Sequence, residues 1–458
     1  MSTTLAVRAS LVAGVLAFAA APASAQLGVF FNRTGSGARA AGMANAFIAV
    51  SDDGTAASWN PSGLAQLRKP ELSIVTTTIG DSATVAGFRT RDGLASFSTA
   101  QSAYNSTALD FASLAVPVTL FGKPVTFQGA WRRIYSLDYR ELLSFTRLPL
   151  APEAPTAARF ENNSDTLGSV DLFSAAVAAR LTGRLSLGGS VNFWRGDWTE
   201  ANVRSATPLD ATAATSFESV EQANRVRGES FTLGLMLTYP RWSAGVVYQS
   251  PLTSDFSASS EAVSSEVPGS VTQQIDGELH FPQSWGVGGA WRPGARWTVA
   301  LDLTWDDWTE ATLDTPETGH VNLFDGLPSD FTSTRDTWSL NAGAERLFAG
   351  DGFVVPLRFG VAWEPQGARD PFTRDPVDFV MLALGTGYNT NSLKFDAAFQ
   401  YRWASFMTGA QFGPGESQGL LPSAIGERSN SQWRLKLSLI VRITDTGKLK
   451  RTLGKVFG

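Results

Sequence analysis

Residues 393–403 read LKFDAAFQYRW and contain the alternation that decides the fold. Most positions in phase with Leu393 and Trp403 are apolar, whereas the positions between them include Lys394, Asp396 and Arg402. A period of two sends alternate side chains to opposite faces of a β-strand. This stretch therefore predicts a strand with one apolar face and one polar, charged face.

Three other stretches repeat this alternation, namely residues 299–306, 357–364 and 434–443. In each of them the apolar face contains no charged residue. A Lys or Arg that faces lipid near the middle of a membrane costs roughly 2 to 4 kcal/mol. Uncharged faces therefore suit a membrane wall, although a water-soluble sandwich also alternates in this way.

The connections between the alternating segments favour a membrane barrel over a sandwich. Tight turns rich in Gly, Pro and Asn, such as residues 121–124 and 389–391, alternate with long polar connections. Strict alternation places every long connection at one end, as in outer-membrane barrels with short periplasmic turns and long external loops. The long connections are residues 139–165, 204–225, 258–274, 313–333, 366–375 and 409–431.

Residues 71–443 are expected to form an all-β, transmembrane antiparallel β-barrel of about 14 strands, an even number as single-chain barrels require. The least certain stretch is residues 81–106, where a second hairpin of the wall would raise the count to roughly 16. The expected strands begin near Glu71, Thr107, Lys123, Thr166, Arg184, Val226, Trp242, Ile275, Ala295, Thr334, Phe353, Pro376, Ser392 and Gln432.

Composition agrees with a membrane wall and removes several other classes of protein. Only 17% of the 458 residues are charged, against about 25% in soluble domains. The chain has no Cys, which excludes disulfide scaffolds, thiolate zinc sites, iron–sulfur clusters and thiol nucleophiles. Past the N-terminus, no apolar run reaches the roughly 18 residues of a membrane-spanning helix. The mild net charge of −5 does not suggest nucleic-acid binding.

The N-terminus predicts export. Residues 1–25 read as a signal peptide, with one cation at Arg8, an apolar run and the small-residue ending at Ala25. We expect the mature chain to begin at Gln26 and to reach the outer membrane of a double-membraned bacterium. Residues 444–458 form a basic tail, which is expected in the periplasm because an even number of strands leaves both termini on that side.

Residues 26–70 precede the first expected strand, and from residue 35 they lack the period of two and are rich in Gly, Ala and Ser. They are too polar to span a membrane alone and too poor in large apolar groups to fold alone, so they require a cavity such as a barrel lumen. Residues 37–43 read GARAAGM and residues 59–65 read WNPSGLA. These motifs resemble the N-terminal hatch of the FadL/TodX (OmpP1) family of outer-membrane channels for hydrophobic compounds. The family's Asn-Pro-Ala-Gly-Leu signature is matched except at Ser62.

The resemblance implies a barrel of about 14 strands plugged on its periplasmic side by the short helices of the hatch. It also implies passive uptake of hydrophobic small molecules, such as long-chain fatty acids or aromatic hydrocarbons, with gating by the hatch and lateral release into the bilayer. The expected partners are outer-membrane lipid and lipopolysaccharide, the hydrophobic ligand and the barrel assembly machinery. The candidate hatch residues are Asn60, Pro61, Ser62 and Gly63, and the candidate ligand-lining residues are Phe379, Met381, Arg358, Lys394 and Arg402.

Each candidate has a physical rationale. Phe379 and Met381 are expected to point inward if their neighbours face lipid. The inward charges either receive a carboxylate head group or pair across the wall and with the hatch, and pairing is the commoner role. Pro61 biases Asn60 away from helix, so that its side chain is available to nearby backbone groups. Gly63 is expected to permit close approach to the barrel wall.

Other functions stay open at this point. Some relatives with the same hatch and barrel resemble partners of protein secretion or surface assembly, so this role is an alternative. An outer-membrane lipid hydrolase is a remote alternative. An enzyme is not expected, because the chain has no G-x-S-x-G nucleophile elbow. His280 and His320 lie far apart without a cysteine or a helical partner, so neither a zinc site nor any other metal or cofactor is expected.

Overall fold

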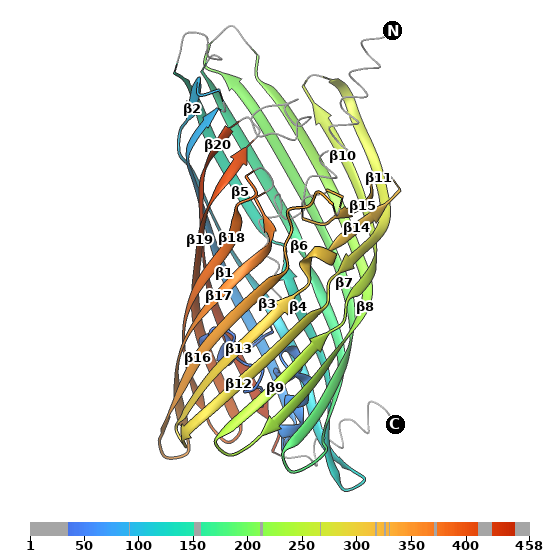
Figure 1. The fold of residues 1–458 in the computed structure, drawn as a ribbon, viewed down its shortest axis with the longest axis vertical. Helices are drawn as coiled ribbons and strands as arrows, with labels where there is room; N and C mark the ends of the chain where they lie inside the picture. Colours follow the sequence, from blue (N-terminus) through green and yellow to red (C-terminus); the bar gives the residue numbers. More distant parts are fainter. Residues whose placement is uncertain are drawn as a thin grey trace.

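The alternating segments form one antiparallel sheet that closes on itself as a tall barrel (Figure 1). The computed structural model describes residues 35–444 except residues 91, 151–156, 211–213, 266, 317, 325–326, 329, 371–372 and 411–423. The expected signal peptide, residues 1–25, and residues 445–458 of the expected tail lie outside the described residues. The predicted all-β barrel is confirmed.

Within the described residues, fourteen strands make up the ring of the barrel, and each pairs with the next in antiparallel fashion. In ring order they are β1 (Glu71–Thr90), β3 (Ala100–Leu120), β4 (Lys123–Ser136), β6 (Ala158–Arg180), β7 (Leu185–Pro208), β8 (Ser216–Thr238), β9 (Trp242–Gln249), β12 (Ser284–Gly294), β13 (Trp297–Asp306), β16 (Thr337–Ala349), β17 (Val354–Arg369), β18 (Pro376–Asn389), β19 (Leu393–Ala410) and β20 (Ala424–Arg442).

The first and last strands close the ring. Glu71 of β1 lies opposite Arg442 of β20, and the pairing continues to Thr90 opposite Ala424. The alternative of roughly 16 wall strands does not hold in the described residues, because residues 84–90 continue β1. The short β2 (Ala95–Phe97) pairs with β5 (Tyr139–Pro149) and does not cross the wall.

The sheet also continues into segments that the sequence analysis treated as long connections. Beyond the membrane both faces of a strand meet polar surroundings, so the apolar alternation fades although the backbone ladder persists. Pro282 interrupts the strand expected from Ile275, because proline has no N–H to donate to the ladder. The strands of these extensions, besides β2 and β5, are β10 (Leu252–Ser264), β11 (Val267–Phe281), β14 (Thr312–Thr315) and β15 (Gly319–Asn322).

The two faces of the wall differ as the sequence predicted. On β13, the side chain of Leu301 is 54% exposed while that of Asp302 is 2% exposed. The outward face is therefore the apolar one, and the inward face carries the charged side chains. Soluble proteins place apolar side chains inside and charged ones outside, and contact with lipid requires the reverse arrangement seen here.

The N-terminal segment lies inside the barrel, near the end that carries the short turns, and is drawn in blue in Figure 1. It contains α3 (Ala38–Gly42) and the 3₁₀ turns η1 (Ala56–Ser58) and η2 (Pro61–Gln66). A further 3₁₀ turn, η3 (Trp308–Glu310), lies between β13 and β14. None of the helices in the described residues is long and apolar enough to cross a membrane.

Candidate functional site

Asn60 ties two parts of the hatch to the barrel wall. Its Oδ1 accepts hydrogen bonds from the backbone N–H of Ser62 at 3.1 Å and from the Ser62 hydroxyl at 2.6 Å. Its Nδ2 donates to the carbonyl of Ile48 in the hatch and to that of Leu235 in β8, both at 3.2 Å. Pro61 follows as the first residue of η2, where its missing N–H has no cost.

The close approach that the sequence analysis assigned to Gly63 is made to another part of the hatch. A side-chain carbon at Gly63 would collide with Ser51, which lies in the hatch itself. The wall contributes the small residues instead. Side-chain carbons at Gly234 of β8 and Gly188 of β7 would collide with Asn60 and Pro61 respectively. Glycines on the wall therefore let the hatch backbone lie directly against the strands.

A network of buried charges holds the first half of the hatch. Arg39 forms ion pairs with Asp52 at 2.5 Å and with Glu345 of β16 at 3.1 Å. Glu345 also accepts from Arg358 of β17 at 2.7 Å, and Arg358 reaches Asp396 of β19 at 2.8 Å. Arg358 is thus paired with two carboxylates of the wall, Glu345 and Asp396.

Asp53 and Lys394 form a second electrostatic contact between hatch and wall. Burial alone raises the pKa of the Asp53 carboxyl, but the positive charges of Lys394 and Arg39 and hydrogen bonds from Thr55 together lower it below its usual value. The side chain of Lys394 is buried. Lys394 therefore faces the hatch, which is the pairing role that the sequence analysis considered commoner.

Phe379 and Met381 both point inward and are fully buried, in the orientation expected from the alternation. Met381 packs against Ala44 of the hatch and against wall alanines. Phe379 lies beneath Arg402, whose guanidinium carbon is 4.7 Å from the ring centroid. Neither apolar side chain lines the cavity of about 110 Å³ to which Arg402 contributes.

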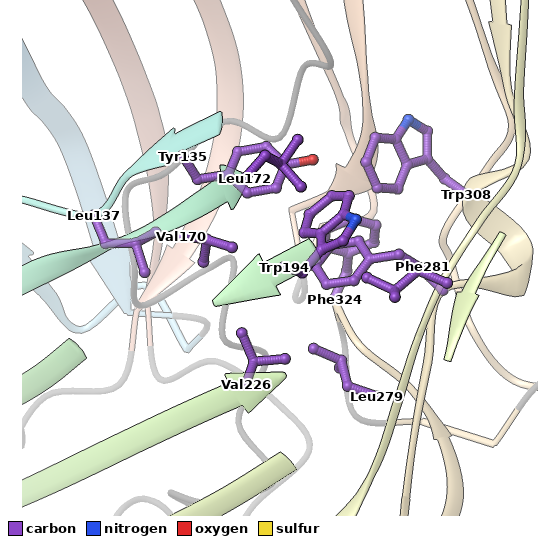
Figure 2. Packing of buried hydrophobic residues seen from close by; sticks show 12 residues of the cluster. Tyr135, Leu137, Val170, Leu172, Trp194, Val226, Leu279, Phe281, Trp308 and Phe324 are labelled. Atoms are coloured by element: carbon purple, nitrogen blue, oxygen red, sulfur yellow. The ribbon is translucent and has the colours of Figure 1, made fainter. Parts of the chain in front are cut away.

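An apolar cluster in the lumen, shown in Figure 2, was not predicted from the sequence. The Phe281 ring stacks on Trp194 at a centroid distance of 5.5 Å and on Tyr135 at 6.1 Å. The sequence carries a signal for it, because apolar residues occupy both faces at Leu172-Phe173 and Phe193-Trp194. The labelled members are Tyr135, Leu137, Val170, Leu172, Trp194, Val226, Leu279, Phe281, Trp308 and Phe324.

The wall is interrupted between β3 and β4. Their ladder runs from Leu120 opposite Lys123 only as far as Phe111 opposite Arg132. A bulge in β3 at Asp110 accompanies the interruption, since Val75 pairs with Phe111 but Thr76 pairs with Leu109. Further along, the backbone N–H of Ser98 donates to Thr146 of β5 at 3.0 Å and closes the wall again. We call the opening between these two closures the wall gap.

A cavity of about 110 Å³ lies at the wall gap. It is lined from inside by β1, β19 and β20 and from the gap by residues of β3, β4 and β5. Tyr135 belongs both to this lining and to the apolar cluster, so the two regions are continuous. Gly35 and Ser36, the first described residues of the hatch, also line the cavity. We call it the gap cavity.

The two histidines meet at one carboxylate, which their separation in the sequence did not indicate. His280 Nε2 lies 3.2 Å from Asp314 Oδ2, and His320 Nδ1 lies 2.5 Å from Asp314 Oδ1. These contacts join β11, β14 and β15. In the part of the chain that the structure describes, no three potential metal ligands are grouped to hold an ion.

The fold and the lumen define an outer-membrane β-barrel whose interior is plugged by its own N-terminal segment. The sequence model of one family, described as outer membrane protein transport protein (OMPP1/FadL/TodX), matches residues 15–415. The chain belongs to this family. No curated protein sequence matches the chain.

Three solved structures show the same fold. A Pseudomonas aeruginosa FadL homologue has a TM-score of 0.65 at 14% identity, covering 90% of this chain and 99% of its own. The P. putida toluene transporter TodX has a TM-score of 0.59 at 13% identity, with the same coverage. The Ralstonia pickettii toluene transporter TbuX has a TM-score of 0.52 at 13% identity, covering 90% and 100%. The family description and the names of the two toluene transporters denote transport proteins.

Proposed function

We propose that this chain takes up hydrophobic small molecules passively across the outer membrane and releases them sideways into the bilayer through the wall gap. The observation that carries the proposal is the interrupted β3–β4 ladder beside a cavity that is continuous with an apolar cluster. Toluene transporters among the neighbours of the fold support the same class of solute.

The apolar cluster supplies the path toward the gap. A water-filled pore disfavours the passage of apolar solutes, because they would stay in contact with water. Buried aromatic and aliphatic side chains favour the binding of such solutes. The hatch packs directly against wall glycines, and we assign the solute to the gap cavity, which continues from the cluster. A solute that leaves there meets outward-facing Leu109, which lines the cavity and is 43% exposed on the lipid side.

We infer that the hatch gates this route through its first described residues. Gly35 and Ser36 line the gap cavity, and the carbonyl of Ser36 accepts from the Trp59 indole at 2.7 Å. Displacement of these residues by a solute would therefore be transmitted to the segment that holds Asn60. We assign residues 26–70 to the hatch, residues 71–443 to the barrel and residues 444–458 to the periplasmic tail.

Filling the gap cavity tests the exit route. Ala108 lines the cavity, and Ala108→Trp should lower uptake of a labelled hydrophobic solute by whole cells roughly tenfold, because the larger side chain raises the barrier to passage. Ala103→Trp is the matched control, since Ala103 lies exposed on the same strand away from the cavity. Both variants should keep the gel shift of a folded barrel. Parental uptake by folded Ala108→Trp would exclude the gap as the exit.

A further inference from the structure

Three tryptophans lie near the short turns, on the outward face of the neighbouring strands β9, β12 and β13 (Figure 1). Trp242 of β9 lies directly opposite Trp291 of β12, and Trp297 begins β13 on the other side of the same hairpin. All three side chains are exposed. Tryptophan gathers at the membrane–water interface, where its ring meets lipid and its N–H meets polar groups. The three rings therefore mark that interface at the short-turn end of the barrel.

Two arginines are held against aromatic rings at the same level. The guanidinium carbon of Arg184 lies 4.4 Å from the ring centroid of Tyr239, and this ring stacks on Trp242 at 4.3 Å. Arg346 of β16 pairs with Trp297 in the ladder, and its guanidinium carbon lies 5.2 Å from a Trp297 ring centroid. Such cation–π contacts hold an arginine in place without neutralising its charge.

The charge of this surface has no acidic counterpart nearby. The adjoining turns read RLTGRL at residues 180–185, TYPRWS at 238–243 and WRPGARWT at 291–298, without an Asp or Glu. The turn after β16 contributes Asp351, which forms no ion pair in the described residues, and neither do the exposed arginines listed here. We call this surface the arginine–tryptophan patch, which comprises Arg184, Arg241, Trp242, Trp291, Trp297 and Arg346.

The position of Arg346 indicates where the missing negative charge comes from. Arg346 is in phase with the outward-facing Leu340 and Phe348, so its side chain leaves the barrel on the lipid side. The cost of a lipid-facing arginine falls toward the interfaces of the membrane, where the phosphate groups of the lipids lie. A planar guanidinium can donate two N–H groups to one phosphate.

We propose that the arginine–tryptophan patch is a binding site for an anionic glycerophospholipid, with the arginines on its phosphodiester and the tryptophans beside its glycerol and upper acyl chains. A zwitterionic lipid is a poorer match, because its own ammonium group already balances its phosphate. Short turns face the periplasm in outer-membrane barrels, so the lipid belongs to the inner leaflet. The site is separate from the solute route, since none of the patch residues lines the gap cavity.

Competition between two lipids tests this assignment. The purified full chain in mild detergent would receive equal amounts of phosphatidylglycerol and phosphatidylcholine with distinguishable acyl masses, and native mass spectrometry would measure the bound ratio. The parent protein should prefer phosphatidylglycerol. Combined Arg184→Gln, Arg241→Gln and Arg346→Gln should lower the ratio at least about fivefold, the change expected from the loss of one such charge contact. The corresponding lysine variant should keep part of the preference, because the charges remain while the planar forks are lost.

Combined Arg195→Gln, Arg225→Gln and Arg227→Gln is the matched control. It removes the same charge from exposed positions of β7 and β8 away from the short turns, and it should keep the parental ratio. All variants should show the gel shift of a folded barrel. A parental ratio in the folded patch variant would overturn the inference, and so would an equal loss in the control. Equal binding of both lipids by the parent protein would also overturn it, in favour of an acidic soluble protein as the partner of the patch.

Discussion

At the scale of single residues, the hatch depends on which wall positions lack a side chain. Gly188, Gly234 and Gly245 on three neighbouring strands all face Asn60 or Pro61. Because the polar groups of Asn60 are buried and satisfied there, a displaced hatch would leave them without partners. These glycines are therefore as much a part of the hatch motif as residues 60–63.

Replacing one of these glycines should displace the hatch without disturbing the wall. Gly234→Val forces a side chain into Asn60, and overpacking of this kind costs about 1 to 3 kcal/mol. Leakage of a small hydrophilic solute through reconstituted barrels should rise. Gly289→Val is the matched control, because a side chain at Gly289 of β12 meets nothing within 4 Å. Equal tightness of both variants would show that the hatch does not depend on this contact.

At the scale of elements, the hatch is held by charges as well as by close packing. Arg39 and Asp53 on the hatch face Glu345 and Lys394 on the wall. Asp302 of β13 adds a carboxylate oxygen that accepts from the backbone N–H groups of Phe47 and Ile48, the latter at 2.7 Å. An element with little regular helix is thus fixed by its contacts with the barrel.

The lowered pKa of Asp53 predicts that acid loosens the hatch. A carboxyl whose pKa falls on docking stabilises the docked state at pH values above its undocked pKa of about 3.9. That contribution decreases once the pH falls below this value and is lost as the pH falls through the lowered pKa of the docked carboxyl. Solute leakage through reconstituted barrels should therefore be low at neutral pH and should rise below about pH 4.

Asp53→Asn separates this effect from general acid damage. The variant should already leak at neutral pH, since it lacks the charge that Lys394 and Arg39 attract, and its leakage should change less on acidification. Asp351→Asn, in a short turn, should behave as the parent does. If leakage through Asp53→Asn rose on acidification as much as leakage through the parent protein, the acid response would belong to other titratable groups.

At the scale of the whole molecule, closure of the ring is the decisive contact. β20 pairs with β1 on one edge and with β19 on the other, so the last strand completes the barrel. The ladder between β1 and β20 ends at Arg442, before the basic tail begins. A closed ring also removes the exposed strand edges that would otherwise promote aggregation.

Two truncations distinguish the last strand from the tail. Removal of residues 445–458 should leave the barrel folded, with a mobility shift between boiled and unboiled samples, because Arg442 already pairs with Glu71 at the start of β1. Removal of residues 424–458 deletes β20 and should abolish both the shift and recovery from outer membranes. Loss of the shift in the shorter truncation would give the tail a role in assembly.

The sequence by itself determined the wall, because a strand's two faces are set locally by the period of two. The alternation in stretches such as residues 393–403 predicts which side chains meet lipid. The alternation of short turns and long connections predicts an even number of strands. Phe379, Met381 and the charged candidates lie buried on the inward face for the same reason. The strands that extend beyond the membrane were not predicted, because both of their faces meet polar surroundings and the sequence therefore shows no apolar alternation.

Only the tertiary structure decided what the inward side chains do. Arg358, Lys394 and Arg434 look alike in the sequence, yet Arg358 faces carboxylates of the wall, Lys394 faces the hatch and Arg434 lines the gap cavity. Their partners lie tens or hundreds of residues away, so no local pattern specifies them. The wall gap likewise lies where β3 bulges at Asp110 and β4 bulges at Ile134, and where the ladder between the described residues of β3 and β4 stops at Phe111. Both are properties of how strands meet around the ring, which closure of the barrel fixes.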